Sequence, residues 1–85
     1  MNVILEVKPE GPDVNMSQVC EELKLVFGEH TGVIWQEMDL VPVAFGVQKA
    51  RIRLQVSSSD EIDALCDTLI EGFEGTIQSV DWERA

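Results

Sequence analysis

The segment from residue 49 to residue 56 constrains the fold more than any other part of the chain, because its side chains alternate strictly. One set is apolar and consists of Ala50, Ile52, Leu54 and Val56. The other set is basic or polar and consists of Lys49, Arg51, Arg53 and Gln55. Successive side chains of a strand point to opposite faces. The pattern therefore predicts a strand in a sheet that buries one face and exposes the other.

Three further segments carry strand patterns, namely residues 3–8, 33–41 and 77–82. In the second of these, strict alternation predicts that Trp35 lies on one face of the sheet and three apolar side chains on the other: Ile34, Met38 and Leu40. Trp35 and Trp82 are expected to pack on the sheet, although a partner contact by Trp82 stays open.

Two amphipathic helices are predicted between the strands. Each follows a capping residue, Asn15 with Gln18 three positions later and Ser58 with Glu61, which fits a capping box. The apolar stripe of the first helix consists of Met16, Val19, Cys20, Leu23, Val26 and Phe27. The stripe of the second consists of Ile62, Leu65, Cys66, Leu69, Ile70 and Phe73. Glycines close both helices.

The resulting order, βαββαβ, predicts a ferredoxin-like plait of the α+β class. Right-handed crossovers place both helices on one face of a four-stranded antiparallel sheet, with the strands in the spatial order fourth, first, third, second. Eighty-five residues support one small core, and no linker or second composition interrupts them. Residues 1–85 are therefore expected to form a single domain.

The apolar segment 40–47 contains two residues that shape a connection, Pro42 and Gly46, on either side of Phe45. Proline restricts the backbone, and glycine adopts conformations closed to other residues. Connections lie on the surface. We predict a stiff loop that exposes Phe45 in part. The alternative is that Phe45 turns inward and covers the end of the sheet.

The charge balance disfavours nucleic acid as a direct partner. Sixteen acidic residues against six basic ones give a net charge of −10, which repels phosphate backbones. RNA-recognition domains of the same topology stack bases on aromatics of the two central strands, and residues 3–8 and 49–56 contain none. The acidity suits solubility or a salty cytoplasm. No apolar run approaches a membrane span and no basic leader is present, so we expect a cytoplasmic protein without a membrane contact.

The polar residues give little support for an enzyme, a metal site or a bound cofactor. Cys20 and Cys66 fall in apolar helical stripes and are expected to be free buried thiols, and the single histidine, His30, is expected in a surface turn. The basic stripe on the predicted open face, Lys49, Arg51 and Arg53, has two interpretations. It meets an acidic partner or an RNA strand, or it pairs with Glu6 or Glu37 on neighbouring strands.

Two segments carry a family resemblance, residues 40–49 (LVPVAFGVQK) and residues 78–81 (QSVD). They resemble the guanine-nucleotide-exchange domain of the beta subunit of translation elongation factor one, and the size and acidity resemble the archaeal form. The resemblance implies a non-enzymatic exchange factor that acts on the GTPase delivering aminoacyl-tRNA. Such a factor would bind the GDP-bound or nucleotide-free GTPase and promote GDP release, and we expect it to be a monomer on its own.

The resemblance also implies a partner-binding surface. Phe45 would insert into the nucleotide-binding domain of the GTPase, on a loop shaped by four neighbours: Pro42, Val43, Ala44 and Gly46. Lys49 and Arg84 are the remaining predicted contacts. Eukaryotic members carry a lysine near the terminus that approaches the magnesium site. No lysine follows Lys49 here, and Arg84 stands too early to replace it.

The alternative function is a ferredoxin-like regulatory or protein-interaction module without exchange activity, for example a small-molecule-sensing dimer. Ligand loops of such modules are rich in glycine near the first helix, and only Gly11 stands there. A concentration-independent monomer would count against this alternative.

Overall fold

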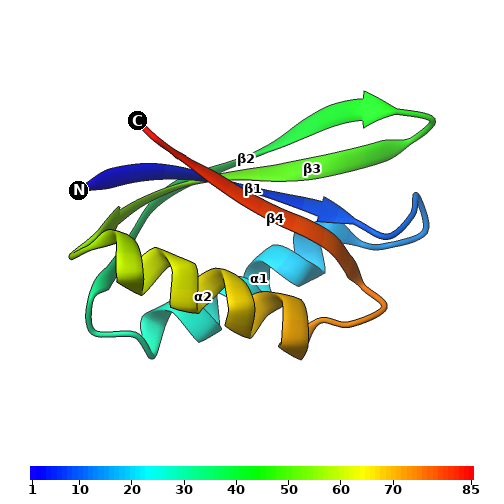
Figure 1. The fold of residues 1–85 in the computed structure, drawn as a ribbon. Coiled ribbons are helices and arrows are strands. Elements are labelled where there is room, and N and C mark those ends of the chain that lie inside the picture. Colours follow the sequence, from blue (N-terminus) through cyan, green and yellow to red (C-terminus); the bar gives the residue numbers. More distant parts are fainter.

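The computed structural model describes residues 1–85 and has the predicted order of elements (Figure 1). The elements are β1 (Asn2–Pro9), α1 (Met16–Gly28), β2 (Val33–Ala44), β3 (Val47–Val56), α2 (Ser59–Gly72) and β4 (Ile77–Arg84). The strands form one antiparallel sheet in the order β2-β3-β1-β4, and both helices cover one face. The predicted ferredoxin-like plait is confirmed. Neither helix is long and apolar enough to span a membrane.

The core lies between the helices and the two central strands, β1 and β3. Leu5 of β1 stands opposite Ile52 of β3, and neither side chain is exposed to solvent. The inward residues of β3 are buried as the alternation predicts. The buried set contains only apolar side chains and no polar or charged one, so burial of apolar surface is what holds the sheet to the helices.

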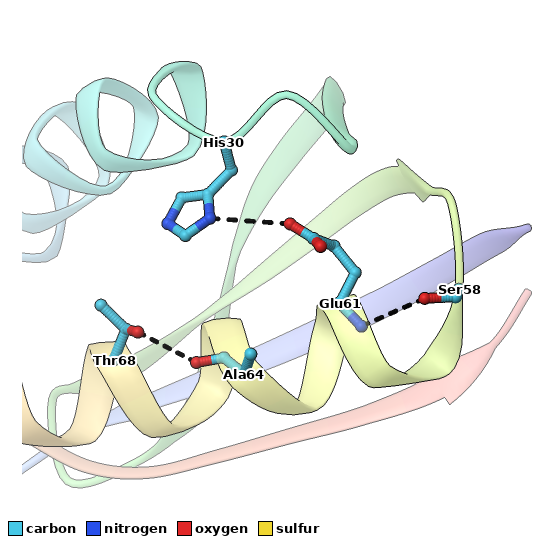
Figure 2. Close-up of polar contacts among 5 residues, drawn as sticks. All are labelled: His30, Ser58, Glu61, Ala64 and Thr68. Atoms are coloured by element: carbon cyan, nitrogen blue, oxygen red, sulfur yellow. Dashed lines mark hydrogen bonds and ion pairs between the residues drawn. The ribbon is translucent and has the colours of Figure 1, made fainter.

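Both helices begin at the predicted capping residues, but neither forms a complete capping box. The Oδ1 atom of Asn15 accepts a hydrogen bond from the backbone N–H of Gln18 at 3.2 Å. The Oγ atom of Ser58 accepts from the backbone N–H of Glu61 at 3.3 Å (Figure 2). The Glu61 carboxylate does not return to the cap; instead it lies 3.7 Å from Nδ1 of His30. The turn before β2 is therefore held against the first turn of α2.

The prediction for the faces of β2 was wrong. The register against β3 shifts between Trp35 and Glu37, so one extra residue, Gln36, is accommodated in β2. Trp35 and Met38 consequently lie on the same, core-facing side, and Trp35 packs against Phe27 with ring centroids 5.5 Å apart. Ile34 faces the open side of the sheet and is 57% exposed. The prediction assumed strict alternation along the strand, so it could not include a bulge.

The positions of two further side chains, Ile70 and Trp82, are resolved only by the structure. Ile70 is 46% exposed and lies outside the core stripe of α2 in which it was predicted. Trp82 lies on the helix side of β4, where its indole N–H donates a hydrogen bond to Asp63 of α2 at 3.0 Å. This contact shows that Trp82 packs within the chain.

Cys20 and Cys66 are free and buried, as predicted. Burial raises the pKa of both thiols, and the pKa of Cys66 rises to about 11 because the carboxylates of Asp63, Asp67 and Asp81 add to the effect of burial. The thiolate is the reactive form.

We expect the folded protein to resist alkylation of both cysteines by iodoacetamide at about pH 8. A rise of about two pKa units lowers the thiolate fraction of Cys66 roughly 100-fold, before steric protection is counted. Mass spectrometry of a time course measures the reaction. Protein unfolded in urea is the control and should gain two adducts quickly. Fast modification of the native protein would show that one of the thiols is accessible.

Candidate functional site

The hairpin formed by β2 and β3 ends in a tight turn of two residues, Phe45 and Gly46. β2 continues to Ala44, three residues beyond the predicted end, and Ala44 pairs with Val47 across the turn. Both loop residues have positive φ values, 52° for Phe45 and 79° for Gly46, which is typical of a type I′ turn. This turn matches the twist of the flanking strands, so the predicted stiff loop is a rigid hairpin tip.

Phe45 is the most exposed large apolar side chain of the protein, with 98% of its surface accessible. The sequence predicted partial exposure and left an inward orientation open; the structure excludes the inward orientation. Phe45 is also the only non-glycine residue with a positive φ, a conformation that costs about 1–2 kcal/mol for a residue with a Cβ. An aromatic ring held in solvent at such a position has no role in the stability of the fold.

The predicted neighbours of Phe45 also lie at the tip. Val43 is 53% exposed, and Pro42 and Ala44 are exposed beside it. Gly46 meets a different part of the chain, because a Cβ atom added there would lie 3.8 Å from Cβ of Pro12. The loop between β1 and α1 therefore passes close to the hairpin tip at Gly46, a contact that the sequence did not predict.

The basic stripe of β3 lies on the open face of the sheet and pairs with acidic residues on the other three strands. Nζ of Lys49 lies 2.5 Å from Oε2 of Glu6, and Nε of Arg53 lies 3.6 Å from Oε1 of Glu37. Pairing with Glu6 and Glu37 was one of the two predicted interpretations, and it is confirmed. The third pair, Arg51 with Glu83 of β4 at 4.0 Å, was not predicted.

The Glu6–Lys49 pair should contribute to stability at neutral pH and lose this contribution in acid. The hydrogen bond from Lys49 lowers the pKa of the Glu6 carboxyl below its usual 4.5, and nearby basic groups act in the same direction. A lowered pKa in the folded state means that the contribution is complete above the unfolded pKa and disappears as pH falls through the folded value.

Urea unfolding of wild type and of Glu6→Gln measures this contribution. We expect a difference of about 0.2–1 kcal/mol at neutral pH, typical of a cross-strand ion pair. The two proteins should converge once the pH falls below the lowered pKa of Glu6 in the folded state. Equal midpoints at both pH values would show that the pair contributes nothing.

Arg84 lies far from the hairpin tip. It is the last residue of β4 and pairs with Val3, which in turn stands opposite Leu54 of β3. Leu54 is seven residues along β3 from Val47, or about 23 Å at the ordinary rise of a strand. The structure therefore brings Pro42, Val43, Ala44, Phe45 and Gly46 together, places Lys49 at the base of the hairpin, and leaves Arg84 at the opposite end of the sheet (Figure 1).

The structure is thus a ferredoxin-like plait that presents an exposed aromatic side chain, Phe45, on a hairpin turn. Residues 2–85 match the family model for the EF-1 guanine nucleotide exchange domain. The chain belongs to this family.

Curated relatives agree with the family assignment. The chain is 36% identical over 81 residues to a probable elongation factor 1-delta of Drosophila melanogaster, and 31% identical over 80 residues to a probable elongation factor 1-beta of the same species. Each alignment covers 94% of this chain but only 30% and 35% of the two relatives. The chain thus spans about a third of the length of these relatives.

Solved structures share the fold at low sequence identity. The C-terminal domain of the MgtC protein from Mycobacterium tuberculosis has a TM-score of 0.73 at 8% identity, covering 99% of this chain and 86% of that domain. The ACT domain from the GTP pyrophosphokinase of Chlorobium tepidum has a TM-score of 0.69 at 14% identity, covering 98% and 97%. At these identities the similarity shows the fold alone.

Proposed function

We propose that this protein promotes GDP release from the elongation GTPase that delivers aminoacyl-tRNA. The observation that carries the proposal is Phe45, fully exposed on a rigid turn, in a chain that belongs to an exchange-domain family. An exposed aromatic on a stiff support is the kind of residue that dominates a protein–protein interface once it is buried in a pocket.

The activity requires only binding. An exchange factor that prefers the nucleotide-free GTPase lowers the affinity of the GTPase for GDP. Bound GDP lowers the affinity of the GTPase for the exchange factor by the same ratio, because linkage is reciprocal. Phe45 inserts into the nucleotide-binding domain and stabilises a conformation in which GDP is held poorly. The hairpin is ordered before it binds, so little conformational entropy is lost on insertion. Pro42, Val43, Ala44 and Gly46 hold this shape and line the contact.

Lys49 and Arg84 have separate roles in binding the GTPase. Lys49 supports the base of the hairpin through Glu6 and extends the contact surface. Arg84 makes a contact at the other end of the sheet, which requires a partner large enough to reach both ends of a domain 35 Å long. GDP-bound and nucleotide-free GTPase are both ligands, and the second binds more tightly.

We infer that the factor is of the archaeal type, acts in the cytoplasm as a monomer and carries out no covalent chemistry. The net charge of −10 supports an acidic cytoplasmic protein that does not bind nucleic acid directly. The two free thiols are typical of a reducing compartment.

Release of fluorescent GDP from the cognate elongation GTPase tests the proposal. The GTPase is loaded with labelled GDP and chased with excess unlabelled nucleotide, with and without this protein. We expect release to accelerate with the concentration of the protein and then to saturate. An unchanged rate at saturating protein would overturn the proposed function.

A further inference from the structure

Exposed apolar side chains stand at both ends of one edge strand of the sheet. Three of the five large hydrophobic residues that are exposed belong to β2 and the turn that follows it: Ile34, Val43 and Phe45. β2 is an outer strand of the sheet, paired with β3 on one side only. Val43 and Phe45 lie at the hairpin tip, whereas Ile34 lies at the other end of β2, with the exposed acidic residues Glu37 and Asp39 between them.

The free side of β2 offers unpaired backbone groups to another strand. Residues 37–41 form its longest regular stretch, between the bulge that follows Trp35 and Pro42, which lacks a backbone N–H. The bulge and the proline limit the part of β2 with which a further strand can pair. They leave five residues with regular strand geometry for an added segment.

A groove runs beside this stretch on the helix side of the sheet. It has a volume of about 410 Å³ and is lined by Ser17, Cys20, Glu21 and Lys24 of α1 and by Trp35 and Met38 of β2. Trp35 is only partly buried there. An apolar floor next to a free strand edge is the arrangement that binds an extended segment, since alternate side chains of the segment enter the groove.

The other edge of the sheet lacks this combination. β4 is shorter, with eight residues, and its open-face side chains near the centre are acidic, Asp81 and Glu83. Its tryptophan, Trp82, is held by a hydrogen bond to Asp63. The β2 edge is therefore the better docking surface of the two.

We propose that residues 37–41 of β2 bind an extended segment of the elongation GTPase as a fifth strand, with an apolar side chain of that segment in the groove between α1 and β2. This inference rests on the proposed function, and it adds a second contact surface to the hairpin tip. The contact is continuous with the tip, because the stretch ends one residue before Pro42.

The charge of β2 favours a segment of the partner, rather than a second copy of this chain, as the strand that pairs with its free edge. β2 carries two acidic residues, Glu37 and Asp39, and no basic one. Antiparallel pairing of two β2 strands would bring these acids together in a dimer of two chains that each carry a net charge of −10, and opposed like charges destabilise a strand pair. Glu37 is already paired with Arg53 of β3. The expected segment therefore carries a basic residue beside Asp39 and apolar residues that face the groove.

Hydrogen–deuterium exchange with the nucleotide-free elongation GTPase tests the backbone part of this proposal. Amides in residues 37–41 should gain protection in the complex, whereas amides of the β4 edge should not. Unchanged exchange in 37–41 would overturn the added strand. Protection of 37–41 that rises with concentration in the protein alone would identify a second copy as the occupant and also overturn it.

Ser17→Trp tests the groove. Ser17 is an exposed residue of α1, so a tryptophan there fills the groove without entering the core. We expect affinity for the nucleotide-free GTPase to fall at least 10-fold. Ala64→Trp adds the same side chain at an exposed position of α2 and serves as the control, with unchanged affinity. Circular dichroism confirms that both variants fold.

The outcomes separate this inference from the proposed function. If wild type accelerates GDP release and Ser17→Trp binds as tightly as wild type, the exchange function stands and the groove contact is overturned. If wild type neither binds the GTPase nor accelerates release, the proposed function fails and the docking surface fails with it.

Discussion

Phe45→Ala is expected to lower the rate of GDP release by roughly 30-fold or more at subsaturating protein. Truncation of a buried interface aromatic commonly costs about 2 kcal/mol or more, and 1.4 kcal/mol corresponds to a factor of ten. The stability of the fold should not change, because the ring is 98% exposed and gives up no buried contact. Labelled-GDP release and thermal unfolding, measured on the same preparation, check the two expectations together.

Phe45→Asn is the matched control for the turn. Asparagine tolerates a positive φ and, before glycine, favours the type I′ turn, so this variant should be at least as stable as wild type and yet as inactive as Phe45→Ala. Full exchange activity in either variant would move the site away from the hairpin tip. Unfolding of Phe45→Ala would show that the ring supports the fold.

Ile52→Ala should produce the opposite pattern, a large loss of stability with the interaction surface left intact. Ile52 is fully buried on the central strand β3, opposite Leu5 on one side and Met38 on the other. Removal of a large aliphatic side chain from such a position costs about 2–5 kcal/mol, a large share of the roughly 5–15 kcal/mol that stabilises a small domain.

Thermal and urea unfolding measure this loss. For a domain of this size we expect the melting temperature to fall by about 10 °C or more. At a temperature where the variant remains folded, GDP release should proceed at the wild-type rate, because Ile52 lies in the core and not at the hairpin tip. If the folded variant loses exchange activity, core packing controls the conformation of the hairpin. If the free energy of unfolding falls by less than about 1 kcal/mol, the core closes over the vacated volume.

Most of the fold could be predicted because the physical rules act locally. The alternation of residues 49–56 reports burial directly, and all four of its apolar residues lie in the core. The capping residues Asn15 and Ser58 locate the helix starts to the residue. The bulge at Gln36 could not be predicted in this way, since an extra residue in one strand is visible only against its partner strand.

The candidate site was predicted less completely, for two reasons. Proline, an aromatic residue and glycine in close succession indicated a connection, but Phe–Gly is not among the favoured pairs for a type I′ turn. The two-residue length of the turn and the full exposure of Phe45 therefore emerged only from the structure, in which Ala44 pairs with Val47. The spatial relations between distant segments were also hidden. Pro12 beside Gly46, Glu83 beside Arg51, and the separation of Arg84 from the tip all depend on the register of the whole sheet.

The two ends of the chain meet at the end of the sheet that is remote from Phe45. The amino group of Met1 donates a hydrogen bond to the carbonyl oxygen of Val56 at 2.9 Å, and the backbone N–H of Ala85 donates to the carbonyl oxygen of Asn2 at 3.0 Å. A short linker could therefore join the ends and produce a circular permutant with new termini in a surface loop. A fluorophore, a surface anchor or a fused domain attached at either end would likewise leave the hairpin pointing freely into solution.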